Sequence, residues 1–301
     1  MSLHVLDART RRRRFISALA STACAAASVI ALGALGLVLS FLVRNGLPHL
    51  RATLFTRVPD NLAPAQGGVL QSLLGTLGIL AIACAIALPV GILGGIQLKD
   101  GKGRWVAAVR FLVEVLAGIP SIVIGIFAYA AIVQPISQAH PGKGFSGYAG
   151  GVALAVLMLP TVMRTTEEML RLVPASLTEA ALGLGASRWR TMFFVVLPAA
   201  RAGVTTGILL AIARVAGETA PLLFTVLGNE FLTTHRWNGL PMLTMDGPVD
   251  ALPLRLYRYA TNADVDQNHI AWATALVLIL MVLALSLAAR IATRGKVVSE
   301  G

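Results

Sequence analysis

The chain has 301 residues, of which 56% are hydrophobic and only 13% are charged, and its formal net charge is +11. Soluble domains usually carry about 25% charged residues, so a soluble globule of this length could not cover its surface with so few charges. A protein whose surface lies mostly in hydrocarbon does not need them. The composition therefore predicts an all-α membrane protein, whose positive charge belongs to its loops and not to a nucleic-acid-binding face.

Six apolar stretches are long enough to cross about 30 Å of hydrocarbon, which takes about 20 residues in a helix. The predicted spans cover residues 15–43, 69–98, 111–133, 148–163, 203–227 and 270–289. Four arginines, Arg11–Arg14, precede the first stretch, which is too long for the apolar region of a signal peptide. We therefore predict an uncleaved first helix.

Lysine and arginine are unequally distributed between the two sides of such a bundle. If the N-terminus is cytoplasmic, 17 of the 25 Lys and Arg residues lie on the cytoplasmic side, seven lie opposite, and Arg214 lies inside a span. Cytoplasmic loops carry this excess, so both termini are expected in the cytoplasm. The chain then divides into a basic N-terminus (1–14), a first helix with an extracytoplasmic segment (15–66), a core (67–294) and a cytoplasmic tail (295–301).

The third predicted span carries three features that bear on its packing. Arg110 and Glu114 lie four residues apart near its cytoplasmic end, which predicts an ion pair. Pro120 lies within the span, where it removes a backbone donor and is expected to kink or weaken the helix. Gly125 in the same span, like Gly95 in the second, predicts close contact with another helix.

Residues 173–198 connect the fourth and fifth predicted spans on the cytoplasmic side. Ser176 and Glu179 have the spacing of a capping box, which predicts that a short helix begins there. Gly185 permits a left-handed turn, after which Ser187 would cap a second short helix. This pattern predicts a helix–turn–helix elbow, which is either a docking site for a partner or an ordinary interfacial helix.

Two charged residues, Arg214 and Glu218, lie four positions apart in the fifth predicted span and so would project on one helix face. Intramembrane ionisable groups usually face an interior or a pathway, which leaves two interpretations: an ion pair that locks two helices, or part of a substrate path. The planar guanidinium suits a phosphate or sulfate group. Glu218 would accept a hydrogen bond from monohydrogen phosphate, whereas sulfate has no proton to donate.

The elbow resembles the EAA loop of ABC importer permeases, in which E-A-A is followed by three residues, a glycine, nine residues and I-x-L-P. The matching residues are Glu179, Ala180, Ala181, Gly185, Leu197 and Pro198, and Val195 replaces the isoleucine. The resemblance implies a type I ABC importer permease fold with cytoplasmic coupling helices. It also implies that the elbow fits a groove on an ATPase subunit and passes its motion to the spans.

Further stretches resemble the phosphate-specific permeases of the ABC type. They comprise residues 116–129, 159–174, 210–225, 252–260 and 271–273. The resemblance implies a permease of the bacterial inner membrane in which Arg214, Glu218 and Thr219 lie on the substrate path. The partners that it implies are a sister permease, a dimer of ATP-binding subunits and a periplasmic phosphate-binding protein.

The sequence contains no Walker A pattern and no Cys/His cluster with metal-ligand spacing. We therefore expect the chain to bind no metal or cofactor of its own, and ATP to be used by the partner ATPase. Two alternatives remain open: a permease for another solute, such as sulfate, molybdate or an amino acid, and a membrane enzyme or scaffold that uses the elbow only for assembly. An ion channel is disfavoured because no pore-loop pattern is present.

Overall fold

The computed structural model describes residues 3–60, 67–231, 234–237 and 240–294, so the predicted tail, 295–301, lies outside it. The helices are α1 (Leu3–Gly46), η1 (Leu47–His49), α2 (Ala52–Thr56), α3 (Leu70–Asp100), α4 (Arg104–Gly118), α5 (Ser121–Ala128), η3 (Tyr129–Val133), α6 (Gln134–Ala139), α7 (Gly147–Arg171), α8 (Ala175–Gly183), α9 (Arg188–Thr191), η4 (Met192–Val196), α10 (Leu197–Ala216), α11 (Ala220–Thr225), α12 (Leu252–Ala260) and α13 (Val265–Arg294). Two short strands, β1 (Thr234–Trp237) and β2 (Leu240–Leu243), pair antiparallel with Thr234 opposite Leu243.

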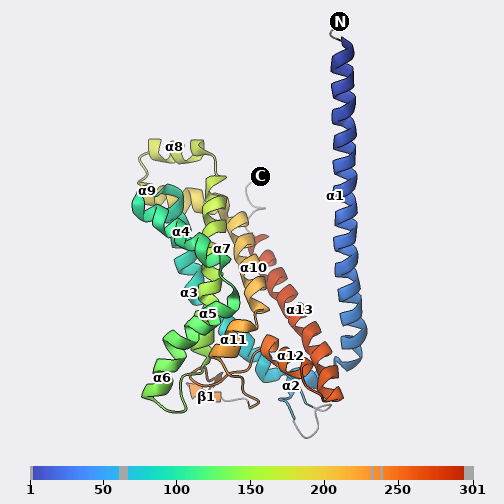
Figure 1. Ribbon diagram of the computed structural model, residues 1–301. Helices are drawn as coiled ribbons and strands as arrows, with labels where there is room; N and C mark the ends of the chain where they lie inside the picture. The colour runs from blue at the N-terminus through green and yellow to red at the C-terminus, as the bar shows by residue number, and fades with distance from the viewer. Residues whose placement is uncertain (1–2, 61–66, 232–233, 238–239, 295–301) are drawn as a thin grey trace.

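The number of predicted spans is confirmed. Within the described residues, six helical segments are long and apolar enough to cross a membrane. They are Thr10–His49, Leu70–Asp100, Ser121–Ala139, Gly147–Arg171, Arg188–Ala216 and Val265–Ala288. Figure 1 places the start of α1, the end of α13 and the protruding α8 at one end of the molecule, and α2, α6, α12 and β1 at the other. An even number of crossings gives this arrangement.

The predicted start of the third span is wrong. Helix α4 ends at Gly118, and Ile119 adopts an extended conformation with φ −73° and ψ 131°. Pro120 disfavours the helical conformation in the residue before it, and it has no amide hydrogen with which to continue the helix. The chain therefore breaks at Pro120 instead of kinking, and the crossing segment begins at Ser121.

The centre of the bundle is the contact between α3 and α7, and glycines allow these helices to approach closely. A Cβ atom on Gly91 would lie 2.6 Å from Cγ1 of Val162, and one on Gly95 would lie 2.6 Å from Cβ of Thr166. Both partner side chains are completely buried. Small residues at a helix crossing let backbones approach and pack in this way, so the prediction for Gly95 is confirmed.

Helix α1 stands apart from the bundle for most of its length (Figure 1). Nearly all of its described side chains are exposed, and it approaches the bundle at its C-terminal end. There Phe41 meets Trp272 edge to face, with ring centroids 5.3 Å apart, and His49 stacks on His269 at 4.5 Å. The first span is therefore attached to the rest of the described chain mainly through the start of α13.

Two of the crossing segments contain a five-residue π-helical turn. Turn η3 joins α5 to α6 in the third span, and turn η4 joins α9 to α10 in the fifth. A π turn holds one residue more than the same length of α-helix and appears mostly as a single turn inside longer helices. The fifth span consequently runs without interruption from Arg188 to Ala216.

Candidate functional site

The elbow predicted on residues 173–198 forms as two short helices joined by a glycine turn. Gly185 has φ +83° and follows α8, where its amide donates to the carbonyl of Leu182. This left-handed conformation closes the end of a helix and favours glycine. Leu197 and Pro198 follow η4 directly within the uninterrupted helical segment Arg188–Ala216, so the proline removes one backbone donor from that helix.

Helix α8 presents its surface outward, and Figure 1 shows it projecting beyond the ends of the bundle helices, with α1, which stands apart, reaching further. None of its residues is buried. Glu179 and Ala180 are exposed and Ala181 is half-buried, while Leu184 at its end is 89% exposed. An exposed short helix with apolar side chains has little to stabilise it within this subunit, so the arrangement suits contact with a partner.

One of the two predicted helix caps is wrong and the other is confirmed. Helix α8 starts at Ala175, two residues earlier than a cap at Ser176 requires, and no side-chain cap is formed. Ser187 does cap α9, since its hydroxyl accepts a hydrogen bond from the amide of Arg190 at 3.4 Å. Pro174 has a fixed φ angle that suits the start of a helix, but its side chain cannot accept the hydrogen bond that the serine was expected to accept.

The predicted fifth span is interrupted between Arg214 and Glu218, so these residues do not share a continuous helix face. Helix α10 ends at Ala216, and α11 begins at Ala220. Pro221 explains the break, because its ring would clash with the carbonyl of residue 217 in a continuous helix. Arg214 is exposed, and Glu218 and Thr219 are half-buried. Among the described side chains, no ion pair joins Arg214 to Glu218.

The break after α10 is followed by α11, whose first residues lie against Gly125 of α5. A Cβ atom on Gly125 would lie 2.8 Å from Cα of Pro221 and 3.2 Å from the carbonyl oxygen of Ala220. Helices α5 and α11 therefore cross with their backbones nearly in contact, as predicted for Gly125. Discontinuous helices are a recurrent way to place backbone polar groups at membrane depth beside a substrate path.

The ion pair predicted between Arg110 and Glu114 is wrong, because Arg110 reaches a different helix. Its guanidinium donates to Oε1 of Glu167 at 2.7 Å and to the carbonyl of Leu98 at 3.0 Å. Arg171 donates to the same Glu167 oxygen at 2.7 Å. We call Arg110, Glu167 and Arg171 the clamp, because these residues join α4 to α7 at the end that carries α8.

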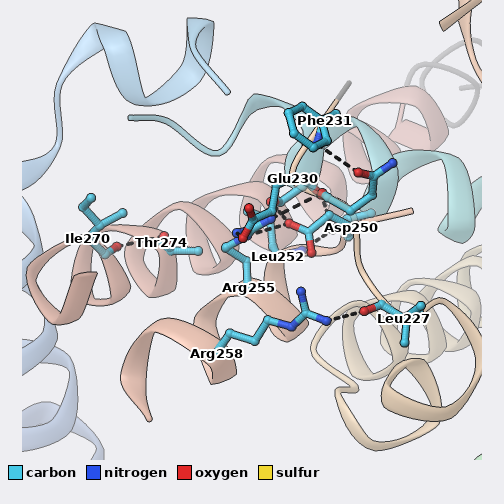
Figure 2. Close-up of polar contacts among 12 residues, drawn as sticks. Leu227, Glu230, Phe231, Asp250, Leu252, Arg255, Arg258, Ile270 and Thr274 are labelled. Carbon is cyan, nitrogen blue, oxygen red and sulfur yellow. Dashed lines mark hydrogen bonds and ion pairs between the residues drawn. The ribbon is translucent and has the colours of Figure 1, made fainter. Parts of the chain in front are cut away.

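A second charged group, which the sequence analysis did not single out, lies at the opposite end. Figure 2 shows Asp250, Glu230 and Arg255 converging. Nε of Arg255 donates to Asp250 at 2.7 Å, and the Arg255 and Asp250 side chains are 1% and 0% exposed. The hydroxyl of Ser72 in α3 donates to the same carboxylate oxygen. We call Ser72, Asp250 and Arg255 the latch, because it fastens the segment between α11 and α13 to α3.

The latch has further neighbours, which contact Arg255. Arg255 also donates to the backbone carbonyl of Asn229 at 3.3 Å and lies 3.5 Å from the Glu230 carboxylate. Burial raises the pKa of Asp250, although the charge of Arg255 and the Ser72 hydroxyl oppose that rise. Burial disfavours the charged form of Arg255, but Asp250 and the other acidic neighbours outweigh it, so the pKa of Arg255 is raised. Arg255 therefore stays charged against a carboxylate.

The sequence indicates little of the clamp or of the latch. Glu167 and Arg171 have i,i+4 spacing in the fourth span, but nothing local indicates that Arg110 joins them from 57 positions away. Asp250 and Arg255 lie in a segment with several prolines and aromatics, where a surface position is the default. In the described residues, no group of three or more His, Cys, Asp or Glu side chains could hold a metal ion.

Known proteins with similar folds share this arrangement of helices. The chain superimposes on an inward-facing structure of the MetNI methionine ABC transporter with a TM-score of 0.53 and 20% identity, covering 76% of this chain and 94% of that one. A bacterial ABC transporter that imports the polysaccharide alginate matches with a TM-score of 0.52 and 15% identity, covering 76% and 79%. At these identities the similarity supports the fold alone, and it confirms the type I importer permease fold.

Sequence relatives are considerably closer. Residues 87–296 match the family described as binding-protein-dependent transport system inner membrane component. The phosphate transport system permease protein PstA of Haemophilus influenzae is 42% identical over 84% of this chain and 85% of its own length. That of Xylella fastidiosa strain 9a5c is 38% identical over 96% and 97%. The chain therefore belongs to the binding-protein-dependent transport system inner membrane components, as a PstA-type permease and a multi-pass protein of the inner membrane.

Proposed function

We propose that this chain is a permease subunit of an ATP-driven phosphate importer and lines the translocation path together with a sister permease. The observation that carries the proposal is Arg214, which is exposed on this subunit beside a break in a membrane-spanning helix. A charged group is costly in hydrocarbon, so Arg214 is expected to face a second subunit or an aqueous path. The names of the relatives from H. influenzae and X. fastidiosa support phosphate as the substrate.

The groups around the break suit a partly protonated phosphate. Arg214 supplies a planar set of donors for the phosphate oxygens, and the Thr219 hydroxyl adds a neutral donor or acceptor. Glu218 accepts a hydrogen bond from the hydroxyl group of monohydrogen phosphate and repels an anion that has no proton to donate, such as sulfate. The three side chains come from the end of α10 and the connection to α11, so their spacing changes when these helices move apart.

The elbow, residues 173–198, would couple ATP hydrolysis by the partner subunits to the movement of the spans. Helix α8 lies at the end where α1 begins (Figure 1), and the excess of Lys and Arg supports a cytoplasmic location for that end. Both termini would then be cytoplasmic, and α8 would fit a dimer of ATP-binding subunits. A binding protein would deliver phosphate at the opposite face. This chain would hold no cofactor itself, and the partner subunits would hydrolyse ATP.

The proposal is tested by phosphate uptake. The substitution Arg214→Gln is expected to lower uptake about tenfold or more, because a hydrogen bond to a charged group contributes about 1.5–3 kcal/mol. The measurement is uptake of radiolabelled phosphate by proteoliposomes that contain the whole complex, with ATP inside and the binding protein outside. The control is Arg44→Gln at the exposed end of α1, which should leave uptake unchanged. Absence of phosphate uptake by the wild-type complex would overturn the proposal.

A second substitution tests the selectivity attributed to Glu218. Glu218→Gln removes the negative charge that excludes sulfate, so unlabelled sulfate should compete with labelled phosphate about tenfold better than it does in the wild type. Competition is measured in the same proteoliposomes, and Glu114→Gln on the exposed face of α4 is the control. Unchanged competition in Glu218→Gln would remove Glu218 from the selectivity mechanism.

A further inference from the structure

A cleft of about 380 Å³ lies between α4 and α7 at the end of the molecule that carries α8. Its charged lining consists of Arg110, Arg164, Arg171, Glu114, Glu167 and Glu168. Three arginines thus face three glutamates, and their formal charges cancel. This balance gives neither a free anion nor a free cation a reason to bind, so the charged groups of the cleft act on one another.

Two neighbouring glutamates in this cleft have very different surroundings. The side chain of Glu167 is 11% exposed and accepts from both Arg110 and Arg171, whereas that of Glu168 is 54% exposed and contacts Arg164 at 3.2 Å on the surface. An exposed pair of the second kind contributes little to stability. Glu167 is the acceptor through which α4 is held against α7, and Arg110 extends the contact to the last turn of α3 through the carbonyl of Leu98.

The helices joined by the clamp lead to the two places already described. Helix α7 ends at Arg171, and only Leu172–Pro174 separates it from α8. Helix α4 leads through the break at Pro120 into α5, which crosses α11 at Gly125 and Pro221. A displacement of α8 therefore has two routes to the break beside Glu218: one along the chain through α9 and α10, and one through Glu167, α4 and α5.

We propose that Glu167 is a positioning residue which, through Arg110, transmits the motion of α8 to α4 and α5. Both sides of the helix break then move together when the ATP-binding subunits move. The proposal rests on the proposed function, because it assigns a role within ATP-driven transport. It attributes to Glu167 an effect on the ratio of phosphate transported to ATP hydrolysed, and no contact with phosphate.

Two substitutions separate this role from a merely structural one, because each removes one arginine from Glu167. Arg110→Gln breaks the link between α4 and α7 and leaves Glu167 paired with Arg171. Arg171→Gln removes a pair within α7 and leaves the link between the helices intact. We expect Arg110→Gln to lower the ratio of phosphate uptake to ATP hydrolysis about fivefold or more, with ATP hydrolysis retained, and Arg171→Gln to leave it within about twofold.

The same proteoliposomes serve the test, and each variant is compared at an equal amount of assembled complex. Glu167→Gln should lower the ratio as much as Arg110→Gln does. The double variant Arg110→Gln/Glu167→Gln should have a ratio no lower than either single variant, because all three variants break the same link. Arg110→Lys should restore part of the ratio, and Glu167→Gln replaces Arg110→Gln in the comparison if the latter does not assemble. Equal ratios in the Arg110 and Arg171 variants would overturn the inference, whereas a wild-type complex without uptake would overturn the proposed function.

Discussion

Replacing Arg255 with methionine is expected to destabilise the complex by about 3–5 kcal/mol, because it leaves a buried carboxylate without its counter-charge. Asp250 would keep only the hydroxyl of Ser72, and its Oδ1 atom already has no hydrogen-bond partner among the described residues. Methionine fills much of the arginine volume, so the loss would come from the charge and not from a cavity. The result is measured as a fall in the thermal unfolding temperature of the purified complex.

Two further substitutions test whether the loss of stability in Arg255→Met comes from the unpaired charge. Arg258→Met alters the same helix, but among the described residues the one hydrogen bond of the Arg258 side chain goes to the backbone carbonyl of Leu227 (Figure 2), so this substitution should cost far less. Adding Asp250→Asn to Arg255→Met should recover part of the stability, since removal of both charges from a buried pair is often close to neutral. A double variant that is less stable than Arg255→Met would contradict this account of the latch.

The substitution Gly125→Ala adds a single methyl group and is expected to lower phosphate uptake about tenfold, because overpacking costs about 1–3 kcal/mol. The new Cβ atom would lie 2.8 Å from the backbone of Pro221, which cannot move aside as a flexible side chain does. Helices α5 and α11 would have to separate, and the break beside Glu218 would change shape. Uptake is measured as for Arg214→Gln, at equal amounts of assembled complex.

The control substitution is Gly118→Ala, at the end of α4 just before the break at Pro120. No atom lies within 4 Å of a Cβ built on Gly118, so the added methyl group meets open space. Gly118 ends α4 and Gly125 lies inside α5, where alanine favours the helix at least as much, so a loss of uptake confined to Gly125→Ala isolates the contact with Pro221. Equal uptake by the two variants would show that the α5–α11 crossing accommodates the added methyl group, which would contradict this prediction.

Long apolar runs and local turn chemistry were sufficient to predict much of this molecule. The six spans follow from hydropathy because each needs about 20 apolar residues, and the elbow follows from Gly185 and Ser187, whose preferences are local. The exact ends were harder to predict. Pro120 and Pro221 lie inside apolar runs, and a proline there is compatible with either a kink or a complete break. Which one occurs depends on the helices packed against it.

The charged groups could not be placed from the sequence for a related reason. Arg110 has Glu114 four residues away, which is the geometry of an ordinary helix pair, yet it bonds Glu167 from another helix. Ser72 and Asp250 are 178 positions apart, and their contact exists only after α3 and the segment before α12 have come together. For Arg214 and Glu218, the spacing was correct but the helix between them was not continuous. Tertiary packing decides each of these cases.

The π turn η4 has a consequence for the register of the fifth span. An α-helix rotates its side chains by about 100° per residue, so a residue added to a regular helix turns everything beyond it to another face. A π turn absorbs that extra residue locally. Because η4 separates α9 from α10, the chain between the elbow and Arg214 accommodates one additional residue while both ends keep their facing. The number of residues between the elbow and Arg214 therefore does not by itself determine the direction in which Arg214 points.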